Sequence, residues 1–330
     1  MQQPYRSRRR FLGLAAAALA AGIAPLPALA AEDAFPSRPM RFIVPFPAGS
    51  GTDTTARMFA KKIGELTGQG VVVENKPGGN GFIGVQTALN APADGYTVFI
   101  GSNSTLSTNA ATFRKLPYDP LTDFAPITLL SRGPCVVIVP AGSPYRTLAE
   151  LLDDARKRPG ALNYGTGSIS YTLYSEWLNE LAKIKTTPVP YKGAGDAING
   201  VMAANVDFAV VDATGAIELV RGGRIRALAY TAPQRSPLLP DVPSIVEAGL
   251  PDFLAYNWVA AAISARTPPA VVKRLQDLFT QAGNAPDVRD YYTRQSTKLI
   301  LSSPAEMLQY QKDEIVRWKR LAAVAKIPLQ

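Results

Sequence analysis

The chain has 330 residues, a formal net charge of +9 at pH 7, one cysteine and no histidine. The lack of histidine excludes Ser-His and Cys-His nucleophile pairs, the usual general base and the commonest transition-metal ligand, so we expect neither a metal nor a cofactor. One cysteine cannot form an internal disulfide. Because the run around Cys135 is apolar, it indicates a small buried side chain rather than a reactive thiol.

The first thirty residues predict a signal peptide. Arginines at positions 6 and 8–10 precede an uncharged Leu/Ala-rich run over residues 11–23, and small residues at 28–30 suit a signal peptidase. The apolar run is shorter than the ~20 residues that a membrane-spanning helix needs. The pattern over residues 7–12 favours twin-arginine (Tat) export of the folded protein, with an Arg-rich Sec signal as the alternative. We therefore expect cleavage after about Ala30 and a periplasmic location.

Removal of this segment lowers the net charge. Residues 1–30 hold four arginines and no acidic residue, so the mature chain carries +5 instead of +9. No dense run of Lys and Arg remains that could follow a phosphate backbone, so nucleic acid is not an expected partner. The remaining excess favours anionic ligands only slightly.

Short β-branched runs alternate with amphipathic stretches along the mature chain, a pattern typical of parallel sheets covered by helices. The first series predicts strands over residues 41–46, 71–73 and 97–100, with helices over 53–66 and 82–89. The second series predicts strands over 135–139, 162–165, 187–190, 208–211 and 227–230, with helices over 148–158 and 173–181. A strand over 258–263 and helices over 270–282 and 304–323 complete the chain.

The two series of strands and helices predict two α/β lobes. The C-terminal helices follow the second series and are assigned to the first lobe, which is therefore discontinuous in sequence. We expect lobe 1 over residues 31–131 and 256–330, and lobe 2 over residues 132–255. The chain would cross between the lobes near residues 128–133 and again near 253–258. Two crossings form a hinge, and ligands of open α/β sheets bind at such junctions.

Three predicted strand-to-helix junctions, residues 45–53, 101–105 and 165–170, consist mainly of glycines and hydroxyl side chains. Backbone N–H groups at the start of a helix point outward at the positive end of its dipole, and glycines allow a ligand to approach closely. Such loops suit a carboxylate or another small anion. The alternative is that they are tight turns and helix caps, with Thr52 or Asp53 capping its own helix. The candidate ligand contacts are Phe46, Ala48, Gly49, Ser50, Gly51, Thr52, Asp53, Ser102, Asn103, Thr166, Gly167, Ser168 and Ser170.

Two further side chains are candidates because each follows a predicted strand. Lys192 could pair with a ligand carboxylate, or it lies solvated on a turn. Asp212 could accept a hydrogen bond from a ligand amine or hydroxyl, or it caps the next helix.

Residues 79–84 match the dinucleotide-binding pattern G-x-G-x-x-G. The preceding strand is the second of its series, however, and the next strand ends in Gly101-Ser102-Asn103 rather than in an acidic residue for a ribose. We therefore interpret residues 79–84 as a glycine-rich turn. The chain also contains no G-x-x-x-x-G-K-[ST] phosphate loop and no G-x-S-x-G nucleophile elbow.

Five segments resemble the Bug receptors, the TctC-like solute-binding subunits of tripartite tricarboxylate transporters. They are residues 41–49 (RFIVPFPAG), 74–79 (ENKPGG), 190–194 (PYKGA), 223–229 (GRIRALA) and 241–251 (DVPSIVEAGLP), and they follow in order over nearly the whole mature chain. The resemblance implies a periplasmic-binding-protein-like (type II, Venus flytrap) fold that closes on a carboxylated ligand. It also implies ligand contacts from residues 46–53, from Thr166, Gly167 and Ser168, and from Asp212.

The sequence departs from this family at two places. Ile169-Ser170-Tyr171 stands where many relatives carry a Gly, a small residue and a His. Residues 211–215 also differ from the sequence that is commoner in the family after the strand predicted over residues 208–211. Both places set ligand identity in the family, so no ligand is transferred from a relative.

The sequence predicts a monomeric receptor, not an enzyme, that captures a small aliphatic or aromatic mono- or dicarboxylate for transport or sensing. Its downstream partner would be a membrane permease or a sensor protein. The alternative is an exported enzyme with lysine- or carboxylate-based catalysis in the same cleft, for which only Asp53, Lys192 and Asp212 could supply an acid and base pair.

Overall fold

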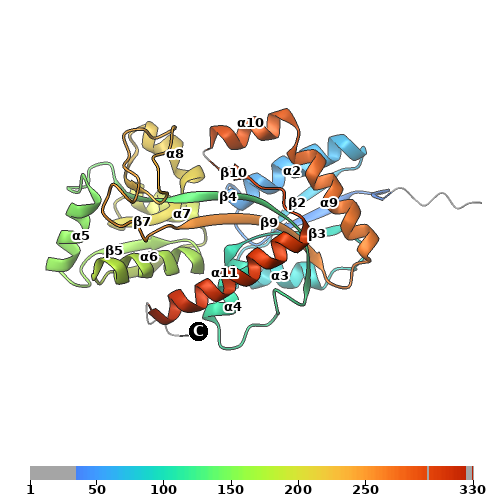
Figure 1. Ribbon diagram of the computed structural model, residues 1–330, viewed down its shortest axis with the longest axis horizontal. Helices are drawn as coiled ribbons and strands as arrows, with labels where there is room; N and C mark the ends of the chain where they lie inside the picture. The colour runs from blue at the N-terminus through green and yellow to red at the C-terminus, as the bar shows by residue number, and fades with distance from the viewer. Residues whose placement is uncertain (1–34, 296, 325–328, 330) are drawn as a thin grey trace, which may run out of the picture. The chain divides into compact units, whose positions relative to one another are not determined.

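The computed structural model describes residues 35–295, 297–324 and 329 (Figure 1). Arg38–Gln330 forms one compact unit, and Met1–Ser37 forms another, of which only residues 35–37 are described. The predicted signal peptide over residues 1–30 lies outside the described residues. Among the helices that are described, none is both long and apolar enough to cross a membrane.

A mixed sheet organises the described part of Arg38–Gln330. Its strands follow the order β2-β1-β3-β9-β4-β7-β5-β6, and β8 and β10 also pair with β4. Its bounds are β1 (Met40–Val44), β2 (Val71–Asn75), β3 (Thr97–Ser102), β4 (Phe124–Pro140), β5 (Asn163–Thr166), β6 (Thr187–Pro190), β7 (Phe208–Asp212), β8 (Ile225–Tyr230), β9 (Tyr256–Ser264) and β10 (Lys298–Leu299).

Helices cover the sheet, as the alternation of runs predicted. On the N-terminal strands, Phe279 of α9 stacks on Phe42 of β1 at 5.5 Å between ring centroids and contacts Phe59 of α2 at 5.6 Å. The helix bounds are α2 (Gly51–Thr67), η1 (Gly79–Gly81), α3 (Phe82–Leu89), η2 (Ser104–Thr108), α4 (Asn109–Thr112), α5 (Leu148–Lys157), α6 (Ile169–Ala182), α7 (Ala194–Met202), α8 (Ala213–Arg221), α9 (Pro269–Gly283), α10 (Pro286–Arg294) and α11 (Pro304–Val324).

The prediction of parallel sheets holds for only part of the sheet. β1, β2 and β3 are parallel, as are β5, β6 and β7, but β4 and β9 run antiparallel to their neighbours. A run of apolar residues indicates burial and not direction. Parallel neighbours are joined by a crossover connection, usually a helix. Neither β4 nor β9 pairs with the strand directly before it in the chain, so no such crossover sets its direction.

β4 is also much longer than the strand that we predicted over residues 135–139. Pro126 and Pro134 weaken the strand signal of its first half because proline removes a ladder donor. The ladder between β4 and β9 accommodates the irregularity by register shifts between Pro126 and Thr128 and between Leu129 and Ser131. It then continues through the pairs Arg132–Trp258, Gly133–Asn257 and Pro134–Tyr256, so that β4 and β9 lie side by side where the chain was expected to cross (Figure 1).

Two helices begin earlier than predicted. The helix expected from residue 53 starts at Gly51, and the one expected from residue 173 starts at Ile169. In both places the first turn contains residues of the glycine and hydroxyl loops, which have weak intrinsic helix preference. The segments η2, α4 and α10 were not predicted at all.

Candidate functional site

Four helices begin around one small enclosed space, here called the inner cavity, with a volume of about 20 Å³. Residues Ser50–Thr52 bring the start of α2, Gly167 and Ser168 the start of α6, Ala194 the start of α7, and Asp212 the start of α8. The first N–H groups of a helix have no partner within the helix. The complete lining is Phe46, Ser50, Gly51, Thr52, Ser102, Ser104, Gly167, Ser168, Tyr171, Ala194, Asp212 and Asn257.

The N-terminal cap of α2 is Ser50, not Thr52 or Asp53. The Ser50 hydroxyl accepts from the N–H of Asp53 over 3.2 Å, and the Asp53 carboxylate accepts from the N–H of Gly49 over 2.8 Å. This reciprocal arrangement fixes the loop in which Gly49 has a φ of 82°, a conformation that favours glycine.

The Asp53 side chain stabilises this loop and does not line the inner cavity. Its carboxylate also accepts from Nε of Arg57 over 3.0 Å and from Nδ2 of Asn75 over 2.9 Å. Burial raises the pKa of Asp53, but the donors from Arg57, Gly49 and Asn75 outweigh that effect and leave the pKa below its ordinary value. The carboxylate is thus ionised and occupied by donors from its own surroundings.

The starts of α6 and α7 touch each other through backbone. A Cβ atom at Gly167 would lie 2.2 Å from the carbonyl carbon of Gly193 and 2.3 Å from the nitrogen of Ala194. Ser168 and Gly193 are the N-cap residues of these helices, and neither makes a side-chain capping bond. Both helix ends are therefore directed at the same place, and only glycine at position 167 allows this approach.

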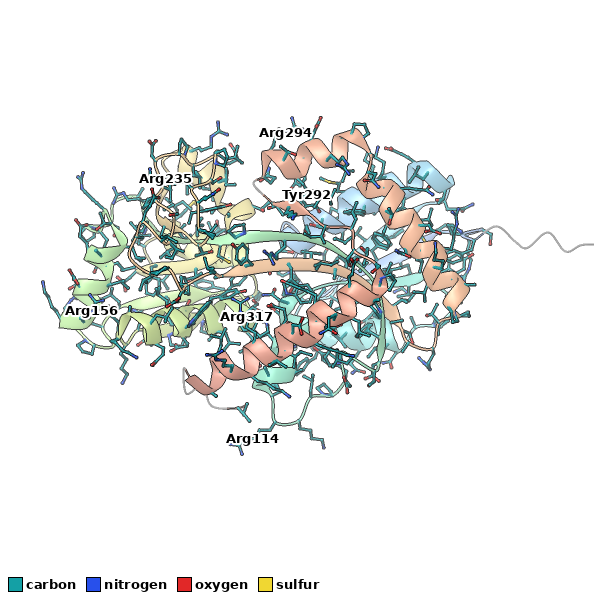
Figure 2. The ribbon with its side chains drawn as sticks, in the orientation of Figure 1. Arg114, Arg156, Arg235, Tyr292, Arg294 and Arg317 are labelled. Carbon is teal, nitrogen blue, oxygen red and sulfur yellow. The ribbon has the colours of Figure 1, made fainter. Side chains whose placement is uncertain are left out.

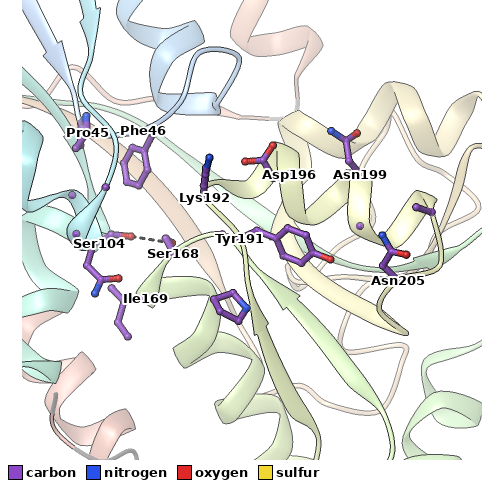
Figure 3. A pocket seen from close by; sticks show the side chains of 18 residues that line it. Pro45, Phe46, Ser104, Ser168, Ile169, Tyr191, Lys192, Asp196, Asn199 and Asn205 are labelled. Carbon is purple, nitrogen blue, oxygen red and sulfur yellow. Dashed lines mark hydrogen bonds between the residues drawn. The ribbon is translucent and has the colours of Figure 1, made fainter.

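Hydroxyl groups bridge η2 and α6. Oγ of Ser104 lies 3.1 Å from Oγ of Ser168 (Figure 3). It also lies 3.0 Å from Oγ of Ser170. Oγ1 of Thr108 lies 2.9 Å from the same Ser170 hydroxyl. Asn103 precedes this cluster. Its side chain is fully buried, and its amide nitrogen and oxygen have no hydrogen-bond partner among the described residues.

Asp212 forms the wall opposite the start of α2. The Tyr171 hydroxyl donates to Oδ1 of Asp212 over 3.4 Å, and a Cβ atom at Gly51 would lie 3.1 Å from Oδ2. Burial raises the pKa of Asp212, and the hydrogen bond from Tyr171 and the backbone N–H groups of Asp212 and Gly215 oppose this only in part. Asp212 is also the N-cap residue of α8, and Gly215 lies in the first turn of that helix, so the helix-cap alternative stays open beside the ligand-contact one.

A larger open cleft of about 890 Å³ adjoins the inner cavity, and we call it the outer cleft. Phe46, Ser104, Gly167 and Ser168 line both spaces. Figure 3 shows Lys192 of the outer cleft between Phe46 and Asp196. The turn over residues 79–81 lines this cleft as η1, and a Cβ at Gly84 would lie 2.8 Å from Pro45, so these glycines serve close packing and a turn.

The structure brings together some predicted contacts and not others. Of the predicted residues, the inner cavity contains Phe46, Ser50, Gly51, Thr52, Ser102, Gly167, Ser168 and Asp212. Lys192 lines only the outer cleft. Neither space is lined by Ala48, Gly49, Asp53, Asn103, Thr166 or Ser170.

Most residues outside these two linings position those within them. The Thr166 hydroxyl, for example, lies 2.8 Å from that of Thr172 and donates to the carbonyl of Ser168 over 2.9 Å. Four residues line the inner cavity without having been among the candidate contacts: Ser104, Tyr171, Ala194 and Asn257. Ala194 follows the Lys192 turn and could have been found as the first residue of its helix. Asn257 lies on β9, where the sequence carries no signal for it.

Among the described residues, no lysine or arginine lines the inner cavity. Arg156 and Arg235, for example, lie on the surface and pair with Asp153 over 2.6 Å and with Glu247 over 2.8 Å (Figure 2). Within the described residues no group of three His, Cys, Asp or Glu side chains could hold a metal ion. The donors that line the cavity are therefore backbone N–H groups, hydroxyls and the amide of Asn257.

The chain matches known proteins over most of its length. Residues 55–327 match the family model described as "Tripartite tricarboxylate transporter family receptor". The protein BugT of Bordetella pertussis is 31% identical over 307 residues, which cover 90% of this chain and 91% of BugT.

Two solved structures are similar over their full length. An R. palustris protein solved with adipate is 30% identical, has a TM-score of 0.86 and matches 89% of this chain and 99% of its own. MatC from Rhodopseudomonas palustris with bound malate is 29% identical, has a TM-score of 0.83 and matches 87% of this chain and 99% of its own.

Proposed function

The chain belongs to the tripartite tricarboxylate transporter receptor family, and on that premise we propose that it captures a small carboxylate in the inner cavity and the adjoining outer cleft. The predicted resemblance to the Bug receptors and the predicted periplasmic-binding-protein-like fold are both confirmed by the similar proteins. The ligands of two solved relatives, adipate and malate, are carboxylates and support the proposed class.

The observation that carries the proposal is the meeting of the starts of α2, α6 and α7 at a cavity lined by hydroxyls. A hydrogen bond to a charged group contributes about 1.5–3 kcal/mol net. Micromolar binding needs about 8 kcal/mol. Three or four such bonds reach that range without a salt bridge, and Phe46 adds apolar contact for an aliphatic chain or an aromatic ring.

A thermal-shift screen with matched pairs tests the carboxylate class. Adipate, malate and benzoate are compared with adipamide, malamide and benzamide, which keep the shape and remove the charge. We expect at least one acid to raise the melting temperature and its amide to leave it unchanged, since ligands of the native state stabilise by mass action. The proposal fails if neutral amides or sugars raise the melting temperature and no acid does.

We also propose that residues 31–131 and 256–330 form lobe 1 and residues 132–255 form lobe 2, with β4 and β9 as the hinge. In support, the inner cavity takes Ser50–Thr52 and Ser104 from the first set and Ser168, Ala194 and Asp212 from the second. A hinge at these strands predicts a smaller radius of gyration in X-ray scattering when the ligand is added. An unchanged radius with bound ligand contradicts this division.

For location, we propose export to the periplasm with cleavage after about Ala30, through the twin-arginine route. The residue pattern over 7–12 and the receptor family support this. The mass of the exported protein should correspond to a chain that starts at Ala31. Replacing Arg8 and Arg9 by lysine should block export, and export at the normal level would instead indicate the Sec route.

We propose further that the protein is a monomeric receptor without catalytic activity, which hands its ligand to a membrane permease or a sensor protein. Within the described residues no hydrogen bond joins Asp53, Lys192 and Asp212, so the acid and base pair that the enzyme alternative needs has no support. Recovery of the bound acid chemically unchanged after prolonged incubation, followed by NMR, is expected. Light scattering should give the mass of one chain.

A further inference from the structure

Asp212 lies where the inner cavity meets a second small cavity behind it, here called the rear cavity. The rear cavity has a volume of about 30 Å³, and parts of α2, β4, β9, α8 and α10 line it. Asp212 lines both spaces, and its side chain is buried. Its Oδ2 would lie 3.1 Å from a Cβ atom at Gly51, so the carboxyl group faces the start of α2 at close range.

Uncharged groups surround this carboxyl on every side that packs against it. Tyr171 on α6 donates to Oδ1, and the thiol of Cys135 on β4 and the phenol of Tyr291 on α10 are the other titratable groups close enough to interact with it. β9 contributes the amide of Asn257, and α8 contributes Thr214 and the backbone N–H of Gly215, which lowers the pKa of Asp212.

Charged side chains near the site are directed elsewhere. Asp53 of α2 pairs with Arg57 over 3.0 Å, and Lys192, which precedes α7, lines only the outer cleft. In the part of the chain that the structure describes, no lysine or arginine lines the inner or the rear cavity, and the whole sequence contains no histidine. Burial raises the pKa of Asp212, as expected for a carboxyl group in such surroundings.

The size of the inner cavity brings a second carboxyl group close to the first. A cavity of about 20 Å³ is large enough for little more than one water molecule. A ligand carboxylate that accepts from the starts of α2, α6 and α7 therefore lies beside Asp212. Two ionised carboxylates this close together repel, and a proton held in an O–H···O⁻ hydrogen bond between them removes that repulsion.

We propose that Asp212 and the ligand carboxylate hold one proton between them, so that capture takes up one proton from solution. This inference rests on the proposed function. Two carboxylates and one proton form a single O–H···O⁻ hydrogen bond, and no other bond is made or broken. We expect the site to accept acids that carry no hydroxyl or amine next to the carboxylate, because the shared proton supplies the donor between the two carboxylates.

Calorimetry on the wild-type protein tests this directly. The probe is whichever of adipate, malate and benzoate gives the largest thermal shift, titrated at pH 7.5 in phosphate, HEPES and Tris, which differ in ionisation enthalpy. The slope of the observed enthalpy against ionisation enthalpy should show uptake of close to one proton. The Kd should rise between pH 6 and pH 8 by up to tenfold per unit, the limit for one proton.

Asp212→Asn removes the titration while keeping the shape, and its amide can donate to the ligand as the shared proton does. We expect this variant to bind without proton uptake, with a Kd that does not change with pH and that at pH 8 is no weaker than that of the wild type. Glu218→Gln, on an exposed residue of the same helix, is the control and should keep the uptake.

Three results would overturn the inference. One is wild-type binding with no proton uptake, because capture would then take no proton from solution. Another is uptake that persists in Asp212→Asn, and the third is uptake that Glu218→Gln removes. If no acid binds at all, the proposed function fails instead, so the two failures are distinguishable.

Discussion

Gly167→Ala separates the role of the converging helix ends from that of the side chains. The added methyl group would lie 2.2 Å from the carbonyl carbon and 2.4 Å from the oxygen of Gly193, and 2.3 Å from the nitrogen of Ala194. Ordinary van der Waals contact for such an atom begins at 3.4 Å, so the starts of α6 and α7 must separate by about 1 Å. Backbone cannot move aside as a flexible side chain can, and the separation therefore displaces the N–H groups that the ligand would use.

The expected cost has two components. Overpacking of this kind lowers the free energy of unfolding by about 1–3 kcal/mol. Loss of one hydrogen bond to a charged ligand, about 1.5–3 kcal/mol, raises the Kd about 10- to 100-fold. A urea titration measures the first quantity, and calorimetric titration with the carboxylate found in the thermal-shift screen measures the second.

Gly195→Ala is the matched control. Gly195 lies in the first turn of α7, and a Cβ atom there meets no heavy atom within 4 Å. This variant should bind as the wild type does and gain up to about 1 kcal/mol in stability, because alanine is the better helix former. The reasoning is refuted if folded Gly167→Ala binds the carboxylate with an unchanged Kd.

Three further changes test the structure around the site. Ser50→Ala removes the cap of α2 and should lower the free energy of unfolding by about 1 kcal/mol in urea, with no loss if Ser50 is not the cap. Asp53→Asn should be less stable than the wild type at pH 7, and the difference should shrink as the pH falls through the lowered native pKa of Asp53, because that stabilisation is lost when the carboxylate is protonated. A difference that grows toward low pH would contradict the assignment. Burial raises the pKa of the Cys135 thiol, with a smaller contribution from the charge of Asp212. Thiol reagents at pH 8 should therefore label Cys135 only as fast as the protein unfolds. Fast labelling of the native protein would mean that the thiol is accessible.

The bounds of helices and strands were predicted well where the amino-acid composition and the spacing of apolar residues indicate the same kind of element. The helix over Phe82–Leu89 and the strand over Thr187–Pro190 have the bounds that were expected. Strand direction could not be predicted, because an apolar run reports burial on both faces and not the neighbour. The first half of β4 was missed because of its prolines, and the π-helical turn η2 because serine, threonine and asparagine are typical of loops.

For the candidate site, the sequence indicated three loops of glycine and hydroxyl residues, and members of all three line the inner cavity. What could not be predicted was which members face the cavity. Asp53 follows Ser50 by three residues, which is the spacing of a reciprocal cap, so its structural role was readable from the sequence. The positions of Asn257, and of Asp212 against Gly51, depend on contacts between distant segments.

The ladder between β4 and β9 has a mechanical consequence. Strands that exchange hydrogen bonds through Arg132–Trp258, Gly133–Asn257 and Pro134–Tyr256 bend and twist together and cannot swivel as a free loop does. With these strands as the proposed hinge, we expect opening and closing of the cleft to be spread over many small torsional changes in the strand pair. The rate of ligand release should then depend in part on the stiffness of that pair, and the register shifts beside Thr128 and Ser131 are where substitutions should alter it.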